Sequence, residues 1–569
     1  MSSTPPSRGT YLLQMFQGWW AVLVGLAFGA SIMAAFEVLL LALFTSVVLL
    51  LTGDEAVPTD LRWLGPLLPT TLEGRLALGL AAACGRGALQ VGLGWARAHF
   101  VASYVVSLRT QLMRAWLAAP WRVQSGFSSA EFSNLLTPTT KGCARAAFGT
   151  SSALEGLGAC VVLTLGAFAL SPVASLVLLV IGVALAAAQR PLIVIAIRLA
   201  RRTSAALQVY GRRLGDTLHS AEEIRAYRVE REVDDWLMES NTQLAKTERA
   251  QAFVQEITPA MFHNLATLGL LLCVGVLFWL QISVLLSIPA LVVLFRAMRR
   301  GQGVSRQAQV MSEGMGWHMA LRDALTALSV SDVEEGTTTV GEVSRVEVED
   351  VHYRYEDGVT ALSGVSVSFV RGEVVGIAGA SGAGKTTLME LLLGLRQPSQ
   401  GAVRVNGEPL AEVDPSSWRS QLRYVPQLPL LFDGTVRENI GFMRTDVSST
   451  SLEDAARRSG LPTELLNQEV GIEGRSLSGG QRQRVALARA LAGPQGSVLI
   501  MDEPTSALDS HTEAFIHQSF RELAADHLVF IISHRPATLM CCDRVVVLSD
   551  GVVAGQGSWD EIKTLCTGP

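Results

Sequence analysis

The chain has 569 residues, 49% of them hydrophobic, and a formal net charge of −5 at pH 7. This length suits two or three domains, and the apolar share is high for a soluble enzyme but ordinary when part of the chain lies in lipid. The negative charge gives no electrostatic support for a nucleic-acid partner. The seven cysteines show no metal-ligand spacing and are expected to be reduced structural thiols.

Apolar stretches dominate residues 18–312, which we interpret as a transmembrane domain. Each has an apolar core of about 20 residues, as a helix needs to cross a bilayer. We expect an aromatic interfacial helix over residues 1–17, followed by six spans. The expected spans are 19–51, from 76 past 109, 154–170, 172–190, from 259, and from 286, with a faint break at 281–283.

The placement of charges predicts the orientation of these spans. Arg and Lys are frequent in the long segments 108–150 and 198–256, which are expected to be helical and cytoplasmic, whereas residues 54–62 hold three acidic residues against one arginine. By the positive-inside bias, both termini lie in the cytoplasm of a cell whose inner (plasma) membrane holds the protein. The richness in Ala, Leu and Arg favours a bacterial source.

Four polar residues inside the expected spans are candidates for a substrate cavity, because polar groups are costly in lipid. Glu37 and Arg86 fall at similar depth in the first two spans. A structural ion pair and separate cavity-facing positions both fit them. His263 and Asn264 in the fifth span fit either a polar pathway or a helix–helix hydrogen bond.

Residues 313–343 are expected to link this domain to a second one at 344–569. Alternating apolar residues over 346–355 predict a strand, and the apolar run 374–378 predicts another that leads into a glycine-rich loop. A helix is expected from Thr386 onward. A strand, a glycine-rich loop and a helix in this order are the context of a phosphate-binding loop.

The predicted phosphate loop would bind ATP through its backbone N–H groups and the N-terminus of the following helix. The catalytic Lys385 supplies a positive charge for the β- and γ-phosphates, and the Thr386 hydroxyl is a Mg²⁺ ligand. The ATP-binding residues of this segment are Gly379, Ala380, Ser381, Gly382, Ala383, Gly384, Lys385, Thr386 and Thr387.

An acidic pair follows a third apolar run, residues 498–501. At the end of a strand beside the phosphate loop, Asp502 would hold the Mg²⁺ shell. Glu503 would act as the general base that polarises the attacking water. The sequence therefore predicts an enzyme that hydrolyses ATP with Mg²⁺.

The sequence Leu477-Ser478-Gly479-Gly480-Gln481 matches the signature of ATP-binding cassette (ABC) proteins letter for letter. The chain resembles a half-size ABC exporter, a polytopic α-helical membrane domain of six spans fused to an α/β P-loop ATPase domain. The motifs that carry the resemblance lie between residues 345 and 560, whereas the first 310 residues are similar only in layout.

The resemblance implies further roles. Tyr355 would stack on adenine, Gln427 would contact Mg²⁺ and the membrane domain, and the catalytic His534 would sense the γ-phosphate. Residues 469–474 and 506–509 resemble the X-loop and D-loop of exporters. Ile472 and Glu473 depart from the usual charges of the X-loop. Coupling helices are expected near 126–135 and 216–227.

The resemblance also implies a partner. In exporters, two cassettes enclose each ATP between the phosphate loop of one subunit and the signature of the other, here Ser478, Gly479, Gly480 and Gln481. Every catalytic position that we identify carries the consensus residue, which favours a homodimer. The cargo is expected to be a peptide, a natural product or an amphipathic, lipid-like molecule.

Other readings stay open. The chain could be one half of a heterodimeric exporter, a lipid flippase, or an ATP-gated channel or sensor on the same scaffold. A soluble ATPase of chromosome maintenance also has the signature and dimerises through ATP. That class has long coiled coils, and the sequence shows no sustained heptads.

Overall fold

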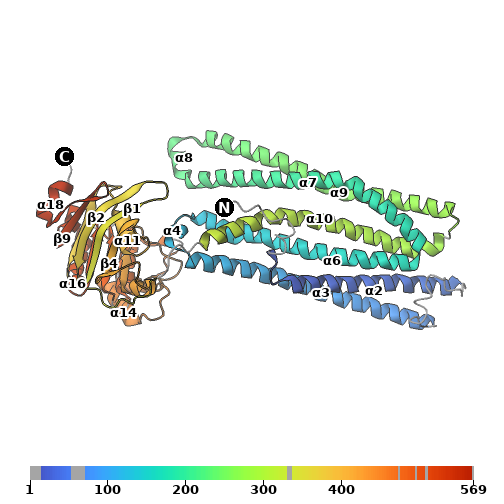
Figure 1. The fold of residues 1–569 in the computed structure, drawn as a ribbon, viewed down its shortest axis with the longest axis horizontal. Coiled ribbons are helices and arrows are strands. Elements are labelled where there is room, and N and C mark those ends of the chain that lie inside the picture. The colour runs from blue at the N-terminus through green and yellow to red at the C-terminus, as the bar shows by residue number, and fades with distance from the viewer. Residues whose placement is uncertain are drawn as a thin grey trace. The chain divides into compact units, whose positions relative to one another are not determined.

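The computed structural model describes residues 15–52, 69, 71–282, 284–329, 336–471, 474–493, 496–505 and 510–566. The chain forms two compact units, Met1–Ala119 with Phe127–Ser329, and Pro120–Gly126 with Val330–Pro569. Figure 1 shows long helices in the first unit and twisted sheets with short helices in the second. The predicted interfacial helix (1–17) and the acidic segment (54–62) lie almost wholly outside the described residues.

The first unit is helical throughout its described part. Its helices are α2 Trp20–Thr52, α3 Leu72–Ala118, α5 Ser129–Asn134, the π-helical turn η3 Leu135–Thr139, α6 Thr140–Leu170, α7 Pro172–His219, α8 Ala221–Tyr227, α9 Glu230–Trp279 and α10 Val284–Leu328.

Five helical stretches of the described chain are long and apolar enough to cross a membrane, and they correspond to the first five predicted spans: Trp20–Val48, Leu72–Ala118, Ser129–Leu170, Pro172–Leu218 and Glu230–Trp279. The sixth long helix, α10, begins next to the predicted start of the sixth span. Arg296, Arg299 and Arg300 interrupt its apolar part, so the sixth span stays a prediction. Because α10 continues to Leu328, the first part of the predicted linker (313–343) is helical.

Proline residues mark helix ends in some places and not in others. Pro172 occupies the first turn of α7 directly after Ser171, where the predicted turn lies. Pro191 and Pro259 instead lie inside α7 and α9. Neighbouring helices can re-satisfy the backbone groups that a proline frees. Both helices therefore continue through these positions, and a bilayer boundary there stays a prediction.

Close packing holds α6 at the centre of the first unit. It contacts α10 and α2, and α7 runs beside α9 (Figure 1). A Cβ atom at Gly142 of α6 would come within 2.4 Å of the Trp317 indole of α10, and one at Gly314 would come within 2.3 Å of the Ala146 Cβ. Small residues at these crossings let the two backbones approach, as is usual between membrane helices.

The second unit is built on two sheets. The four-stranded sheet has the order β2-β1-β4-β5, and the six-stranded sheet has the order β10-β9-β3-β8-β7-β6 with parallel pairing from β9 to β6. The strands are β1 Arg345–Arg354, β2 Thr360–Val370, β3 Val374–Gly379, β4 Gln400–Val405, β5 Glu408–Pro409, β6 Leu422–Val425, β7 Val498–Asp502, β8 Leu528–Ile532, β9 Arg544–Ser549 and β10 Val552–Gly557.

Short helices surround these sheets. They are α4 Trp121–Gln124, α11 Lys385–Leu392, α12 Pro415–Gln421, α13 Val436–Gly441, α14 Ser449–Arg458, the 3-10 turn η4 Thr463–Asn467, α15 Gly479–Leu491, α16 Ser510–Ala524, α17 Pro536–Leu539 and α18 Trp559–Cys566.

Side-chain alternation along β3 divides the core of this unit. Val375 and Ile377 pack with the four-stranded sheet and α11, whereas Val374 and Ala378 pack on the opposite face with α15, α16 and α18. A strand that is buried on both faces is continuously apolar, which explains the run at 374–378. The core fixes β3 and β7, whose ends carry the predicted phosphate loop and acidic pair.

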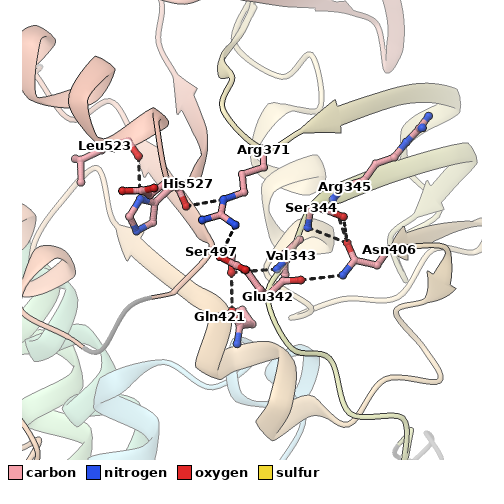
Figure 2. A network of polar contacts seen from close by, with 11 residues as sticks. Glu342, Val343, Ser344, Arg345, Arg371, Asn406, Gln421, Ser497, Leu523 and His527 are labelled. Atoms are coloured by element: carbon pink, nitrogen blue, oxygen red, sulfur yellow. Dashed lines mark hydrogen bonds and ion pairs between the residues drawn. The ribbon is translucent and has the colours of Figure 1, made fainter.

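A polar network joins the start of β1 to the edges of both sheets (Figure 2). The Ser497 hydroxyl accepts a hydrogen bond from Val343 N at 3.0 Å and donates to Gln421 Oε1 at 2.8 Å. Asn406 Oδ1 accepts from Ser344 N at 2.9 Å, and its amide donates to Glu342 O at 3.0 Å. Ser497 is buried, so its loss would leave polar groups unpaired.

We expect Ser497→Ala to destabilise the second unit by about 1–3 kcal/mol, because a buried N–H and a partly buried amide oxygen lose their partner. Thermal unfolding of the full chain in detergent, followed by intrinsic fluorescence, should show a lower Tm for the variant. The exposed Ser363 provides the control Ser363→Ala, which should match the parent. Equal Tm values for Ser497→Ala and the parent would contradict the role of the network.

Candidate nucleotide site

The predicted phosphate loop lies between β3 and α11, as the sequence indicated. Gly379 and Gly384 have φ values of 151° and 99°, which glycine adopts without strain. A Cβ atom at Gly384 would also come within 2.6 Å of the Ala361 oxygen. The glycines therefore allow a tight turn that ends at the N-terminus of α11, a favourable place for an anion.

Lys385 is folded over this loop. Its Nζ atom donates to the carbonyl oxygens of Gly379 and Ala380, both at 2.8 Å. Burial lowers the pKa of Lys385, and the carboxylates of Glu503 and Asp502 oppose that shift. The loop thus holds a cation whose two carbonyl contacts can be exchanged for phosphate oxygens.

The Glu503 carboxylate is held from both sides at the end of β7. Gln427 Nε2 donates to its Oε2 at 2.9 Å, and His534 Nδ1 lies 2.6 Å from its Oε1. The backbone is fixed too, since Glu503 N donates to Ile532 O at 2.9 Å and Gln483 Nε2 donates to Glu503 O at 2.6 Å. These contacts bring together three predicted site residues from three different segments.

Glu503 adopts a left-handed backbone conformation with a φ of 47°. This conformation is uncommon for a residue with a side chain and is concentrated at functional sites. Gln483, which binds the Glu503 carbonyl, was missed by the sequence analysis. It lies on α15, two residues beyond the signature, and only the fold shows that this helix reaches the acidic pair.

Mg²⁺ suits the oxygen donors of the site. Asp502 offers a carboxylate, Thr386 a hydroxyl, and Gln427 an amide oxygen that its bond to Glu503 leaves available. Burial and the neighbouring Glu503 raise the pKa of Asp502, while Lys385 lowers it. No cluster of three His, Cys, Asp or Glu among the described residues could hold a metal alone. Mg²⁺ commonly uses one or two carboxylates together with substrate phosphates.

The predicted adenine contact, Tyr355, lies just after β1. Its hydroxyl is 2.9 Å from Thr387 Oγ1, which ties it to the first turn of α11. The Arg396 guanidinium lies 5.0 Å from its ring centroid, and Tyr353 contacts it edge-on at 5.1 Å. Arg396 was not predicted, because no spacing in the sequence relates it to Tyr355.

The signature residues begin α15 with a capping box. Ser478 Oγ accepts from Gln481 N at 3.2 Å, and Gln481 Oε1 accepts from Ser478 N at 2.8 Å. Ser478 is exposed. No hydrogen bond or ion pair between described residues joins residues 478–481 to the phosphate loop (379–386). The signature is therefore held by polar contacts within its own helix.

Several other residues that the sequence analysis named are not part of the nucleotide site that the structure describes. The D-loop residues 506–509 and X-loop residues 472–473 lie outside the described part. Glu37 lies 3.7 Å from Arg86 but also pairs with Arg296 of α10, which the sequence analysis missed. His263 and Asn264 are exposed on α9, and their role stays a prediction.

We expect Tyr355→Ala to raise the KM for ATP about tenfold, because a stacked aromatic ring contributes about 1–3 kcal/mol to binding a base. Tyr355→Phe is the matched control, since it keeps the ring and loses only the bond to Thr387. Its KM should stay within about twofold of the parental value. Steady-state ATP hydrolysis at varied ATP measures both. A parental KM for Tyr355→Ala would refute the adenine assignment.

Comparison with known proteins agrees with this geometry. Residues 362–506 match the family described as ABC transporter. A glutathione/L-cysteine transport system ATP-binding/permease protein, CydC of Bacillus subtilis, is 41% identical over 209 residues, which cover 36% of each protein. An ATP-dependent lipid A-core flippase of Neisseria meningitidis is 35% identical over 221 residues, covering 38% of this chain and 35% of the relative.

A probable ABC transporter ATP-binding/permease protein of Haemophilus influenzae is 35% identical over 223 residues, or 38% of this chain and 40% of the relative. The chain thus matches less than half the length of these relatives. A solved bacterial Atm1-family ABC exporter with ATP bound has a TM-score of 0.76 at 21% identity, covering 95% of this chain and 96% of its own. The predicted fold class is confirmed: the chain carries an ATP-binding domain of the ABC transporter family and has the fold of an ABC exporter along nearly its whole length.

Proposed function

We propose that two copies of this chain form an ATP-driven exporter in the inner membrane, with both termini in the cytoplasm. The observation that carries the proposal is the Glu503 carboxylate, held between Gln427 and His534 beside a phosphate loop that matches the ABC family. A carboxylate fixed by two neighbours next to bound triphosphate can accept a proton from water. This arrangement supports ATP hydrolysis as the energy source.

In the proposed site, the phosphate loop binds the triphosphate and Lys385 contacts its terminal phosphates. Glu503 orients the attacking water and takes its proton, while His534 positions the Glu503 carboxylate and contacts the γ-phosphate. Asp502, Thr386 and Gln427 would hold Mg²⁺, which supplies positive charge that offsets the charge of the phosphates.

The signature supports a site shared between copies. Ser478 is exposed and begins a helix of 13 residues, whose free N–H groups favour an anion. No hydrogen bond or ion pair between described residues joins it to the phosphate loop of its own chain. We infer that it completes the site of a second copy, so that ATP favours the closed dimer by differential affinity. Consensus residues at all identified catalytic positions favour a homodimer over one half of a heterodimer.

The first unit, which we call the membrane unit from here on, would form the path of the cargo across the bilayer; the second is the ATPase unit. Five apolar helices of spanning length and the additional helix α10 give the helical framework that alternating access requires. The relatives are named for transport of glutathione and L-cysteine and for flipping of lipid A core. Their cargoes differ in chemistry, so the cargo of this chain has to be argued from its own residues.

Transport can be tested in sealed vesicles that hold the protein with its ATPase units outside. The proposal predicts that Mg²⁺-ATP drives a fluorescent cargo into the lumen beyond its external concentration, and that nucleotide removal stops uptake. An ATP-gated channel would only equalise the two concentrations. Equalisation without accumulation, for every cargo that moves, would contradict the exporter and support the channel.

A further inference from the structure

The membrane unit contains a cavity of about 520 Å³ between α2, α3, α6 and α10. This volume is within the usual range for a small-molecule site. Four arginines and one glutamate are among its described lining residues, an excess of three positive charges: Arg86, Arg97, Arg299, Arg300 and Glu155. Ionisable residues at such positions are costly, and they commonly mark the path of a substrate.

The two glutamates of this region are already engaged. Glu155 is bound by both arms of the Arg97 guanidinium, with Arg97 Nε 2.9 Å from Glu155 Oε1, and it also accepts from Ser151 Oγ at 2.9 Å. Glu37, which is not among the lining residues, pairs with Arg296 and lies 3.7 Å from Arg86. Both carboxylates are buried, so their negative charge is already balanced by the arginines that contact them.

The remaining positive charge has no counterpart in the described chain. Arg299 and Arg300 are exposed in this single copy and make no hydrogen bond or ion pair with a described residue. Arg86 Nε is buried and also lacks a hydrogen-bond partner among these residues. Buried donors are rarely left unpaired, and guanidinium groups prefer carboxylate, phosphate and similar oxyanions.

We propose that this arginine cavity, lined by Arg86, Arg97, Arg299 and Arg300, receives the acidic part of the cargo, an organic anion with at least two negative charges. The inference rests on the proposed exporter function and specifies its substrate class. Because field lines concentrate in a low-dielectric cavity of one sign, the site attracts anions and repels cations of equal size. The acidic groups can belong to a soluble molecule or to a lipid headgroup.

Two xanthene dyes of matched size test the charge preference, the polyanion carboxyfluorescein and a cationic rhodamine methyl ester. The full chain is placed in zwitterionic vesicles with its ATPase units outside, and ATP-dependent uptake of each dye is measured. A separate arm follows transfer of labelled cardiolipin, an anionic lipid with two phosphates in its headgroup, between leaflets. We expect uptake of carboxyfluorescein or transfer of the anionic lipid, and no uptake of the rhodamine. The arm that responds identifies the source of the acidic group.

Substitutions of the cavity arginines test whether the transported anion binds in this cavity. The double variant Arg299→Gln/Arg300→Gln should raise the half-saturating concentration of the transported anion about tenfold, the effect of roughly one lost charge-assisted contact. Arg299→Lys/Arg300→Lys retains the charge and should stay within about threefold of the parent. Arg306 lies on the same helix and is not among the residues that line the cavity. Arg306→Gln should therefore match the parent.

Size-exclusion profiles show whether each variant is folded. If Arg299→Gln/Arg300→Gln does not fold, Arg299→Lys/Arg300→Lys still tests whether the charge of these residues is needed. Uptake of the rhodamine without the anions, or equal half-saturation for the Gln pair and the parent, would overturn the arginine-cavity inference. Either result would leave ATP-driven export intact. Absence of ATP-dependent movement of every probe would instead contradict the exporter itself and the inference with it.

Discussion

Glu503→Gln is expected to lower steady-state ATP hydrolysis about 100-fold or more while ATP stays bound. The amide keeps the size of the side chain and can still contact Gln427 and His534, which hold the carboxylate in the parent. It cannot accept the proton of the attacking water, and general bases contribute about 10²–10⁴-fold to rates. The chain should therefore accumulate in the ATP-bound, closed form.

Two measurements check this expectation, phosphate release and the amount of ATP retained after rapid gel filtration. Glu522→Gln is the matched control, because Glu522 is an exposed residue of α16 that bonds only Gln518 among the described contacts. This control should hydrolyse ATP at the parental rate and retain little. Parental hydrolysis by Glu503→Gln would remove the residue from the role of general base.

Mixed dimers give the second large expected effect. We expect Lys385→Ala on one chain and Ser478→Arg on the other to leave one complete ATP site. Both changes on one chain, paired with a parental chain, should leave none. In a shared site, the phosphate loop of each copy meets the signature of the other, so the two substitutions on separate chains damage the same site. A site formed within each chain predicts the reverse pattern.

The dimers can be isolated with two different affinity tags, and ATP retention can be measured with Glu503→Gln present on both chains. We expect about one ATP per dimer for the separated changes and close to none for the combined changes, because only the signature N-terminus completes each anion site. ATP retention by the dimer with both changes on one chain, together with no retention by the dimer with the changes on separate chains, would show that each chain builds its own site.

The sequence predicted the ATPase unit well, because its motifs are local. The phosphate loop needs a strand, particular glycines and a helix start within a few residues, and all of these occur in order at 374–392. Contacts between distant segments were not predictable in this way. Gln483 reaches the Glu503 carbonyl, and Arg396 covers Tyr355, because the fold brings α15 and the segment that follows α11 to the site.

In the membrane unit, even fewer contacts between distant segments could be predicted from the sequence. Hydropathy located the apolar segments, since a span depends on composition over about 20 residues. It could not show that helices extend through Pro191 and Pro259. The sequence left open whether Glu37 pairs with Arg86 on the next span, and it gave no sign of the nearer partner, Arg296, which is 259 residues away in the chain. Charge compensation between distant helices depends on packing that no local pattern encodes.

Counting the chains in each particle tests directly whether ATP is hydrolysed only where two copies meet. The protein can be placed in lipid nanodiscs, sorted into discs with one copy or two by stepwise photobleaching of a terminal label, and assayed for phosphate release per chain. A site shared between copies predicts full hydrolysis in two-copy discs and almost none in one-copy discs. Equal rates per chain in both would contradict it, because the Ser478 face of a lone chain has no partner.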